Sequence, residues 1–520
     1  MSLAKKINWT VFIPSVVILF VIGFLFSRIE GDANALLNGI FDAIVRNFGW
    51  GYIWYMIIVT FAAFYFAFSK YGNVVLGDPN SKPDYTMVEY MALLVAMGIG
   101  SSILRTGSMQ WVTIYLAPPF GIEPQSAEAL MWGQPYSMFL WSFQFFAIFV
   151  MTGPAIAYMV HVRKKPMVRI SELCRVLFGD KFSDGIAGKI IDVLFMVSII
   201  AGASVFLGFG APMIIVSVEY LFNIKVGLGQ ITIIVLLWTA AFTTSAYIGL
   251  DKSIKFLSIW NMRVAAVFGI FITITGPTVF ILDHFTDSMG WFIQKQLDLT
   301  FYANSLGLGG GTDYMRNFTV FWIAYVATWA LLHGVYAARV SRGRTIKEMI
   351  LTYLFGPLIL TTTATGILGG ISIERQLSGA VDVTGIVTAA GGGGAGMVAA
   401  IPHVLASLPW GTFTLVVFVI MVMVFLTTTM DSTAYTIAMY ASNEDMGKVE
   451  PSKSVRLITC FVIGAIAIVF LNIGGLAPLE TMSGLMGIPI IGIQFITIWA
   501  AKKMMDEDKA WINNVRRKSL

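Results

Sequence analysis

Runs of about 20 predominantly apolar residues recur along the whole chain, and this recurrence limits the possible fold more than any other feature. A run of that length is what an α-helix needs to cross the hydrocarbon core of a bilayer. The runs do not alternate polar with apolar residues, as the strands of a membrane β-barrel would. Because lipid cannot satisfy exposed backbone groups, the runs predict transmembrane helices and an all-α polytopic membrane protein.

The composition agrees with this prediction and excludes several classes of function. Of the 520 residues, 57% are hydrophobic and 12% are charged, whereas soluble proteins carry about 25% charged residues. The net charge of +5 comes from Lys and Arg in loops and does not indicate nucleic-acid binding. Two distant cysteines, Cys174 and Cys460, give no disulfide framework.

No catalytic pattern stands out in the sequence. The four histidines and two cysteines are scattered and suggest neither a metal site nor a catalytic cluster. A phosphate-binding loop and a nucleophile elbow are both missing from the sequence. We therefore expect no enzyme, no cofactor and no ATP-driven transport by this chain alone, with Na⁺ as the one possible bound ion.

The apolar runs predict twelve spans. The basic start of the chain resembles a signal peptide, but its apolar run is long and we expect a retained first span. The predicted spans are Trp9–Phe26, Trp50–Phe68, Met87–Ala117, Tyr136–Met159, Ile190–Val218, Ile231–Tyr247, Phe256–Leu282, Phe318–Arg339, Ile346–Ile371, Gly411–Tyr440, Val455–Leu471 and Thr481–Lys502.

Positive charges fall on alternate sides of these spans. The loop between spans four and five is rich in Lys and Arg, and the loop between eight and nine holds Arg342 and Arg344. The loop between three and four, by contrast, contains no Lys or Arg. Because cytoplasmic loops carry the excess of positive charge, both termini are predicted to be cytoplasmic, with the protein in the cell (inner) membrane.

Two connecting segments are unusual. The segment after span seven, "FTDSMGWFIQKQLDLTFY", mixes aromatic and charged residues and predicts an interfacial helix on the outer face. Glu374–Pro409 contains "AAGGGGAG" and is interpreted either as a flexible external loop or as a mobile lid over an outward-facing cavity.

The third span contains residues that weaken a membrane helix. Gly98, Gly100, Ser101 and Ser102 lie close together near its middle, and glycine destabilises a helix by up to about 1 kcal/mol relative to alanine. Unwound backbone at membrane depth occurs only where protein buries it or where it lines a cavity, and there it can bind ions or polar groups. The cluster therefore predicts either a functional break or close helix packing through small residues.

Span ten holds a second polar cluster, "FLTTTMDSTAY". Its Thr and Ser oxygens suit a hard cation such as sodium, and Asp431 is a functional candidate because acidic residues are rare in membrane helices. The threonines could equally bond back to their own helix.

Aromatic residues form a third group. Trp141 lies in span four, and Trp322, Tyr325 and Trp329 have the i, i+3, i+7 spacing that puts them on one face of span eight. Such a face can serve packing, but it can also form a cage for a quaternary ammonium ion through cation–π attraction.

Arg105 and His333 complete the set of unusual residues within the spans. A mid-membrane arginine costs about 2.5 kcal/mol or more unless it is paired or hydrated. Arg105 could hold a substrate carboxylate, replace a bound cation, or pair with Asp431 or a backbone carbonyl. His333 could be a packing residue or could relay a proton.

Several motifs resemble those of the betaine/carnitine/choline transporter family. The most specific is "ARVSRGRTIKE" at Ala338–Glu348. Others are "MGIG" in the third span, "APPFG" at Ala117–Gly121, which resembles the carnitine branch, "IGLDKSIKFLSIWNM" at Ile248–Met262, and "TTTMDSTAY" in span ten. The resemblance extends over all twelve spans in order.

The resemblance implies a LeuT-like fold of two inverted five-helix repeats preceded by two helices. It also implies a substrate site midway across the membrane and a homotrimer. The corresponding division is 1–86 for the two leading helices, 87–282 for the first repeat, 283–317 for the external interfacial region, 318–502 for the second repeat and 503–520 for a short cytoplasmic tail.

The resemblance further implies an aromatic box for a quaternary-ammonium substrate, which is often zwitterionic. Trp141, Tyr325 and Trp329 match box positions, with Trp322 beside them. Amides near Gly98 and Gly100, together with Arg105, are expected to meet a carboxylate. Phe146, Thr113 and Val326 stand at other aromatic positions of the family, so the box is depleted and the ligand could be an unusual methylated amine.

For ion coupling, the resemblance implies a sodium site between spans three and ten. Its ligands would be the carbonyls of Ala96, Ile99 and Phe425 and the hydroxyls of Thr428 and Thr429. Asn261 stands where sodium-independent exchangers have an arginine, which favours sodium. Arg105 and His333, which depart from the family pattern, argue against it.

We therefore predict a secondary active transporter of a betaine- or carnitine-type compound that works by alternating access and is coupled to sodium. The alternatives are a sodium-independent substrate/product antiporter, a receptor that binds such a ligand without moving it, and a channel.

Overall fold

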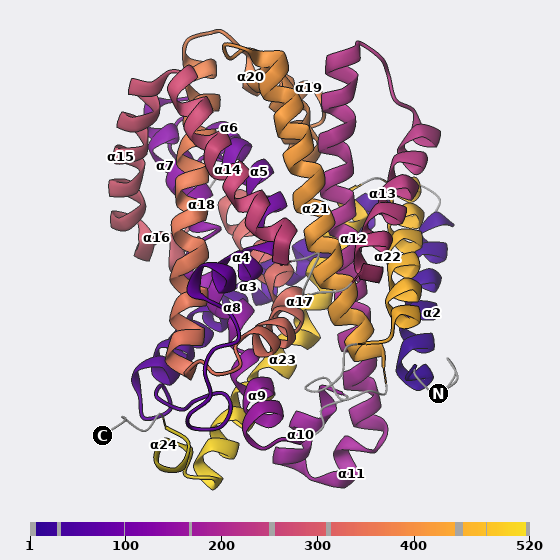
Figure 1. Cartoon of the computed structure of the whole chain (residues 1–520). Helices are drawn as coiled ribbons and strands as arrows, with labels where there is room; N and C mark the ends of the chain where they lie inside the picture. The colour runs from indigo at the N-terminus through magenta and orange to yellow at the C-terminus, as the bar shows by residue number, and fades with distance from the viewer. Residues whose placement is uncertain are drawn as a thin grey trace.

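The computed structural model of the chain describes residues 7–28, 33–97, 99–165, 169–248, 255–307, 314–442, 451–474 and 476–515 (Figure 1). Within these ranges the chain forms helices and three isolated β-bridges. The all-α fold predicted from the apolar runs is confirmed.

Within the described ranges, eight helical stretches are long and apolar enough to cross a membrane. They are Gly39–Phe68, Ala127–Val162 (which contains short interruptions), Ile186–Ser204, Phe256–Thr275, Tyr314–Val340, Ile346–Leu377, Gly411–Ala441 and Leu485–Glu507. Four shorter apolar helices accompany them: Trp9–Leu25, Gly210–Phe222, Gly229–Thr244 and Gly393–Ala406. The protein is therefore a multi-pass membrane protein, while the count of twelve spans stays a prediction.

In the part of the chain that the structure describes, ten long helices form the body of the molecule, and shorter helices connect them. The long helices are α2 (Trp9–Ser27), α3 (Ala33–Phe68), α12 (Ile186–Phe222), α13 (Leu228–Ile248), α14 (Lys255–Thr275), α17 (Tyr314–Val340), α18 (Ile346–Leu377), α21 (Gly411–Ala441), α22 (Lys453–Gly474) and α23 (Leu476–Glu507). The connecting helices are α10 (Ser171–Phe178), α11 (Asp180–Ser183), α15 (Thr278–Gln294), α16 (Gln296–Thr300), α19 (Val383–Ala389), α20 (Gly393–Ala406) and α24 (Ala510–Asn513).

The third predicted span is interrupted, as its glycines and serines indicate. It consists of α4 (Met87–Ala96), α5 (Ile99–Met109) and α6 (Trp111–Leu116), and α4 ends with Met97 as its C-cap. Gly98 lies outside the described residues. The helix therefore stops where the sequence makes helical backbone least stable.

The fourth span is interrupted as well, which the sequence analysis did not predict. It is divided into α7 (Ala127–Phe139), α8 (Phe143–Val150), α9 (Gly153–Ala157) and a π-helical turn, η1 (Tyr158–Val162). Before α8, Ser142 adopts the extended conformation of an N-cap residue, with φ −81° and ψ 170°. Trp141 therefore lies in a break between two helices.

Helix packing follows a symmetric pattern that relates the first five spans of the predicted repeats to the second five. In this pattern α12 and α21 are equivalent and contact each other, and so do α13 and α22. The contact of α5 with α18 matches that of α17 with α8 and α9, and the contact of α14 with α4 matches that of α17 with α23. Two repeats of the predicted five-helix unit would produce this pairing, and the division into repeats stays a prediction.

The start of α2 and the helix α24 lie toward the same end of the molecule, on opposite sides of it (Figure 1). The three β-bridges join Ile7 to Ser442, Val74 to Val515, and Val75 to Thr345. Arg163 forms ion pairs with Glu507 and Asp508, each with an N–O distance of 2.7 Å. The basic loops therefore gather at the same end as the first and last described residues, and the side of the membrane on which this end lies stays a prediction.

Two connections differ from the sequence-based expectation. Glu374–Pro409 is not a structureless loop, because it contains α19 and α20, which contact each other while α20 also contacts α5, α12 and α21. The seventh span ends at Thr275 instead of Leu282, because Gly276 and Pro277 separate α14 from α15. Thr278 to Leu282 thus belong to α15, the helix predicted to be interfacial.

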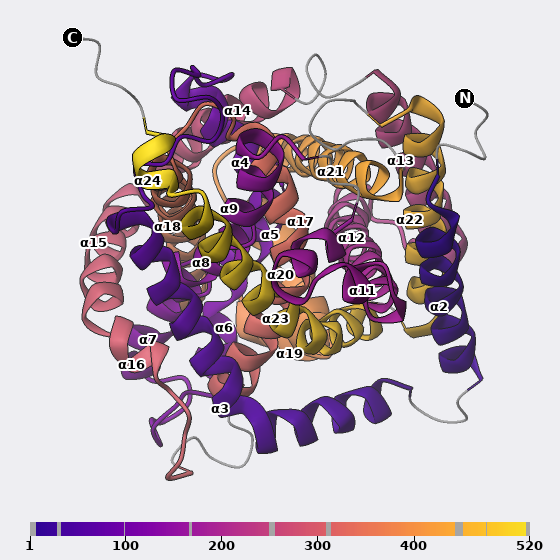
Figure 2. The same cartoon turned by 90° about the horizontal axis from the view of Figure 1, so that it is seen from below.

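Seen from below, α5 and α17 lie near the middle of the molecule, while α2 and α15 lie at its edge (Figure 2). The interrupted third span and the aromatic eighth span are therefore enclosed by other helices.

Candidate functional site

The break in the fourth span brings Trp141 against α17 and α18. The indole N–H of Trp322 donates to the carbonyl of Leu140 at 2.7 Å, and the hydroxyl of Thr361 donates to the carbonyl of Trp141 at 3.4 Å. Side chains from two other helices thus satisfy backbone groups that the break releases. This is how interrupted helices are tolerated at membrane depth.

Four aromatic side chains that the sequence singled out lie together. The ring centroids of Trp141 and Trp322 are 5.4 Å apart in an edge-to-face arrangement. Trp322 and Tyr325 are also 5.4 Å apart, and Tyr325 and Trp329 are 6.4 Å apart. All four are at most 4% exposed, so they face the protein interior and do not anchor the chain at the membrane surface.

These aromatic residues line a cavity together with the break in the third span. Its volume is about 10 Å³, enough for roughly one water molecule and too little for a trimethylammonium group. In this structure the aromatic rings therefore pack against one another and leave no room for a substrate. The lining residues are Met97, Ile99, Ser102, Trp141, Phe149, Trp322, Tyr325, Val326, Trp329 and His333.

His333 is the polar aromatic member of this cavity. Its ring stacks on Phe149 with centroids 4.0 Å apart, and its Nδ1 hydrogen-bonds with the hydroxyl of Tyr353 on α18. Met97, at the break in the third span, lines the same cavity. His333 therefore joins the eighth span to α18 beside this break.

The opposite face of α5 meets α21. A Cβ atom added to Gly100 would lie 2.2 Å from ring atoms of Phe425, so the ring packs directly on this glycine. The hydroxyls of Thr428 and Thr429 both donate to the Phe425 carbonyl oxygen, each at 2.9 Å. Because both hydrogens point at this carbonyl, the oxygen lone pairs of the two hydroxyls remain available as acceptors.

Residues of the predicted sodium site thus come close to the helix break. Ala96 is the last residue of α4, and carbonyls in the last turn of a helix have no partner within it. Ile99 begins α5, which contacts α21. The predicted substrate site and the predicted sodium site therefore lie on different faces of α5. Ile99 and Ser102 line the aromatic cavity, whereas Gly100 contacts Phe425.

Arg105 is buried on α5, with 3% exposure, and does not line the aromatic cavity. Three other residues stand where the family has aromatic side chains. Phe146 is fully buried, and its ring centroid lies 6.3 Å from that of Trp141. Val326 lines the aromatic cavity. The hydroxyl of Thr113 donates to the Gln110 carbonyl at 2.7 Å.

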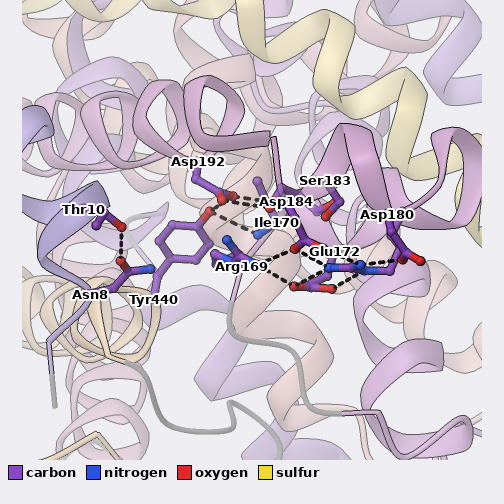
Figure 3. Close-up of polar contacts among 12 residues, drawn as sticks. Asn8, Thr10, Arg169, Ile170, Glu172, Asp180, Ser183, Asp184, Asp192 and Tyr440 are labelled. Atoms are coloured by element: carbon purple, nitrogen blue, oxygen red, sulfur yellow. Dashed lines mark hydrogen bonds and ion pairs between the residues drawn. The ribbon is translucent and has the colours of Figure 1, made fainter. Parts of the chain in front are cut away.

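The sequence analysis missed a buried polar cluster near the end that holds α24 (Figure 3). The carboxylate of Asp192 on α12 accepts hydrogen bonds from the Tyr440 hydroxyl at 2.6 Å, the Ser171 hydroxyl at 2.8 Å and the Ser171 amide at 3.0 Å. The Tyr440 hydroxyl also accepts from the Ile170 amide at 3.0 Å. The lone Asp192 in an apolar run was a signal that could have pointed to this cluster.

Beside it, basic residues of the loop are paired with acids. Arg175 contacts Glu172, Asp180 and Asp184 at N–O distances of 2.9, 2.5 and 2.7 Å. Hydrogen bonding from Arg175 lowers the pKa of the exposed Asp184 carboxyl below its ordinary value. The positive loop is therefore partly neutralised by its own acids.

Comparisons with known proteins cover nearly the whole chain. Residues 10–510 match the model of the betaine/carnitine/choline family of transporters, which confirms the resemblance noted in the sequence. Among solved structures, the chain is similar to a Na⁺-coupled sialic acid symporter in a substrate-bound outward-open state. The identity is 12%, the TM-score is 0.42, and the alignment covers 87% of this chain and 86% of the symporter. A likeness at this level does not by itself establish a shared fold.

Proposed function

The chain belongs to the betaine/carnitine/choline transporter family, and we propose that this secondary transporter carries a quaternary-ammonium compound of the betaine or carnitine type. The observation that carries the proposal is the group of Trp141, Trp322, Tyr325 and Trp329 around one buried cavity beside the break in the third span. Aromatic faces attract a cation that has no N–H group to hydrogen-bond, and the attraction is strongest when the site excludes water.

The closed state of the cavity supports alternating access. A volume of about 10 Å³ cannot hold the substrate, so the rings must separate before it binds. The interrupted helices α4–α5 and α7–α8 border this cavity, and helices of this type commonly form the binding sites of secondary transporters. The amides near Gly98 and Gly100, with Arg105, are proposed to approach a substrate carboxylate once the cavity opens.

Sodium is the proposed coupling ion. The Phe425 carbonyl with the Thr428 and Thr429 hydroxyls offers three oxygen atoms within one turn of α21. The carbonyls of Ala96 and Ile99, on either side of the break, would complete an all-oxygen set that suits a hard cation. No single acidic ligand is needed, because sodium carries only one charge.

A sodium-independent antiporter is the second candidate, and His333 favours it. This residue departs from the family pattern and lines the aromatic cavity beside Met97 at the break, where its polar ring could take the place of a coupling cation.

Uptake into liposomes separates these candidates. Purified protein in liposomes is given labelled glycine betaine, carnitine, choline and related methylated amines, with or without an inward sodium gradient. Concentrative uptake that requires the gradient supports the proposal. Uptake that ignores sodium but is stimulated by internal substrate indicates exchange. Binding without uptake indicates a receptor, and flux that neither saturates nor shows counterflow indicates a channel.

Mass measurement in a mild detergent checks the proposed homotrimer, and cell fractionation checks the proposed location in the cell membrane.

A further inference from the structure

A second, much larger cavity lies apart from the aromatic cavity. Its volume is about 600 Å³, within the range of small-molecule binding pockets, and it is bordered by α4, α5, α14, α18 and α21. In both views α14 lies outside α4 and α5, with α18 and α21 to its two sides (Figures 1 and 2). Part of its inner wall is shared with the proposed sodium site, since Gly100, Phe425 and Thr428 also line it.

The cavity opens sideways between α14 and α18. Three isoleucines at its rim are strongly exposed: Ile270 by 61%, Ile274 by 69% and Ile359 by 67%. In a multi-pass membrane protein, exposed apolar side chains on spanning helices face hydrocarbon and not water. The surroundings of this opening are therefore lipid chains.

The inner wall is almost wholly apolar and reaches the middle of the protein. It includes Ile103 and Leu104 on α5, each 4% exposed, and Phe425 on α21, which is 6% exposed. Lipids that merely surround the protein cannot reach such buried side chains. A molecule in contact with them must occupy the cavity itself.

One end of the cavity carries polar atoms that lack partners. Ser258 and Asn261 on α14 are 5% and 3% exposed, and both line the cavity. Neither the Ser258 Oγ nor the Asn261 Nδ2 has a hydrogen-bond partner among the described residues. A buried donor without a hydrogen-bond partner is destabilising, so these atoms call for an acceptor that enters the cavity.

The cavity is long enough to hold a lipid chain of one leaflet. Along α14 the lining extends from Ser258 to Ile274, a distance of about 24 Å at 1.5 Å per residue. One leaflet of the hydrocarbon core is about 15 Å deep, half of the roughly 30 Å total. Ser258 lies one turn after the start of α14, so it is near one end of this spanning helix, where the ester oxygens of a phospholipid are expected.

We propose that this cavity binds one acyl chain of a bilayer phospholipid, whose ester oxygen accepts a hydrogen bond from Asn261 or Ser258. The chain enters between α14 and α18 and lies along the apolar wall. It contacts Gly100 and the Phe425 ring, the same pair that joins α5 to α21. The bound lipid thereby supports the helix segment next to the break in the third span.

Photolabelling in a defined membrane tests the proposal. The full chain is reconstituted in vesicles of phosphatidylethanolamine and phosphatidylglycerol that contain a trace of phosphatidylethanolamine with a diazirine at mid-chain. After irradiation, peptide mass spectrometry locates the labelled residues. We expect label on the buried wall at Ile103, Leu104 or Phe425, in addition to the exposed rim. Label confined to Ile270, Ile274, Ile359 and other exposed positions would overturn the proposal, because surrounding lipid alone explains that pattern.

Two variants and their controls sharpen the result. Gly269→Phe places a ring in the cavity, since a Cβ added at Gly269 meets only the Ile367 side chain at 3.8 Å. It should abolish label on the buried wall, whereas Val267→Phe, at a 67% exposed position outside the lining, should leave it unchanged. Asn261→Leu should weaken wall labelling, and Thr273→Val should not, because the Thr273 hydroxyl already donates to the Gly269 carbonyl at 2.7 Å. Equal wall labelling in Gly269→Phe and Val267→Phe would also contradict the proposal.

Discussion

Trp141 donates its indole N–H to the hydroxyl of Thr106 over 2.8 Å, and this bond joins the break of the fourth span to α5. Both residues are buried, Trp141 with 4% exposure and Thr106 with none. The Thr106 hydroxyl in turn donates to the Ser102 carbonyl at 2.9 Å, and Ser102 lines the aromatic cavity. The two interrupted spans are therefore held together next to the proposed substrate site.

A double-mutant cycle measures this connection. Trp141→Phe and Thr106→Val should each reduce thermal stability in detergent by the equivalent of about 1 kcal/mol or more, because each leaves a buried partner without its bond. The double variant should lose clearly less stability than the sum of the two single losses. Either single change already breaks the hydrogen bond, so the second change cannot break it again. Strict additivity would show that the hydrogen bond does not contribute.

Trp329→Ala tests the aromatic box. Loss of one cation–π partner should weaken binding of the transported compound by about 2 kcal/mol, which is roughly 30-fold. Isothermal titration in detergent checks this, with Trp499→Ala, at a 60% exposed position on α23, as the matched control. Unchanged affinity for every betaine tested would exclude Trp329 from the site.

Thr428→Val and Thr429→Val test the proposed sodium ligands. Each change keeps the shape of the side chain and removes one oxygen, so half-maximal uptake should need a sodium concentration at least about tenfold higher, or 1.4 kcal/mol. The control is Thr436→Val on the same helix, whose hydroxyl donates to the Ser432 carbonyl at 2.8 Å. Uptake in liposomes over a range of sodium concentrations gives the values. Identical sodium dependence in all three variants would assign coupling to another site.

Asp192 and Tyr440 are predicted to stabilise the fold by joining α12 to α21. Asp192→Asn directs an amide group at the donors of Tyr440 and Ser171, and should cost about 1–3 kcal/mol. Tyr440→Phe removes one of the three donors and should cost less. Thermal unfolding of the purified variants orders them, and a Tyr440→Phe loss larger than that of Asp192→Asn would contradict this account.

The lowered pKa of Asp184 predicts that the stability of the loop containing α10 and α11 depends on pH. Arg175 lowers its pKa in the folded protein, so its stabilising effect is complete above the ordinary Asp pKa of about 3.9. The effect disappears as the pH falls through the lower, folded value. Hydrogen exchange of residues 171–184, corrected for intrinsic rates, should show protection that is constant near neutrality and is lost in acid. Asp184→Asn should lower protection already at neutral pH and flatten the profile.

Local sequence patterns predicted much of this architecture. The apolar runs gave the spanning helices, and the glycine cluster indicated the end of α4 at Ala96. The spacing of Trp322, Tyr325 and Trp329 put them on one face, where the structure has them lining one cavity. The break at Leu140–Ser142 was not predicted, because its released carbonyls are stabilised by Trp322 and Thr361, residues far away in the chain.

The sequence by itself determined the membrane class, the family and the positions of the polar and aromatic clusters, because these depend on residue type and on helical periodicity. The tertiary structure decided which clusters meet. It directed Ile99 to the aromatic cavity and Gly100 to Phe425, although the two residues are adjacent in the chain. It also joined Asp192 to Tyr440 across 248 positions. Such contacts depend on how helices pack against one another, and no local pattern specifies that packing.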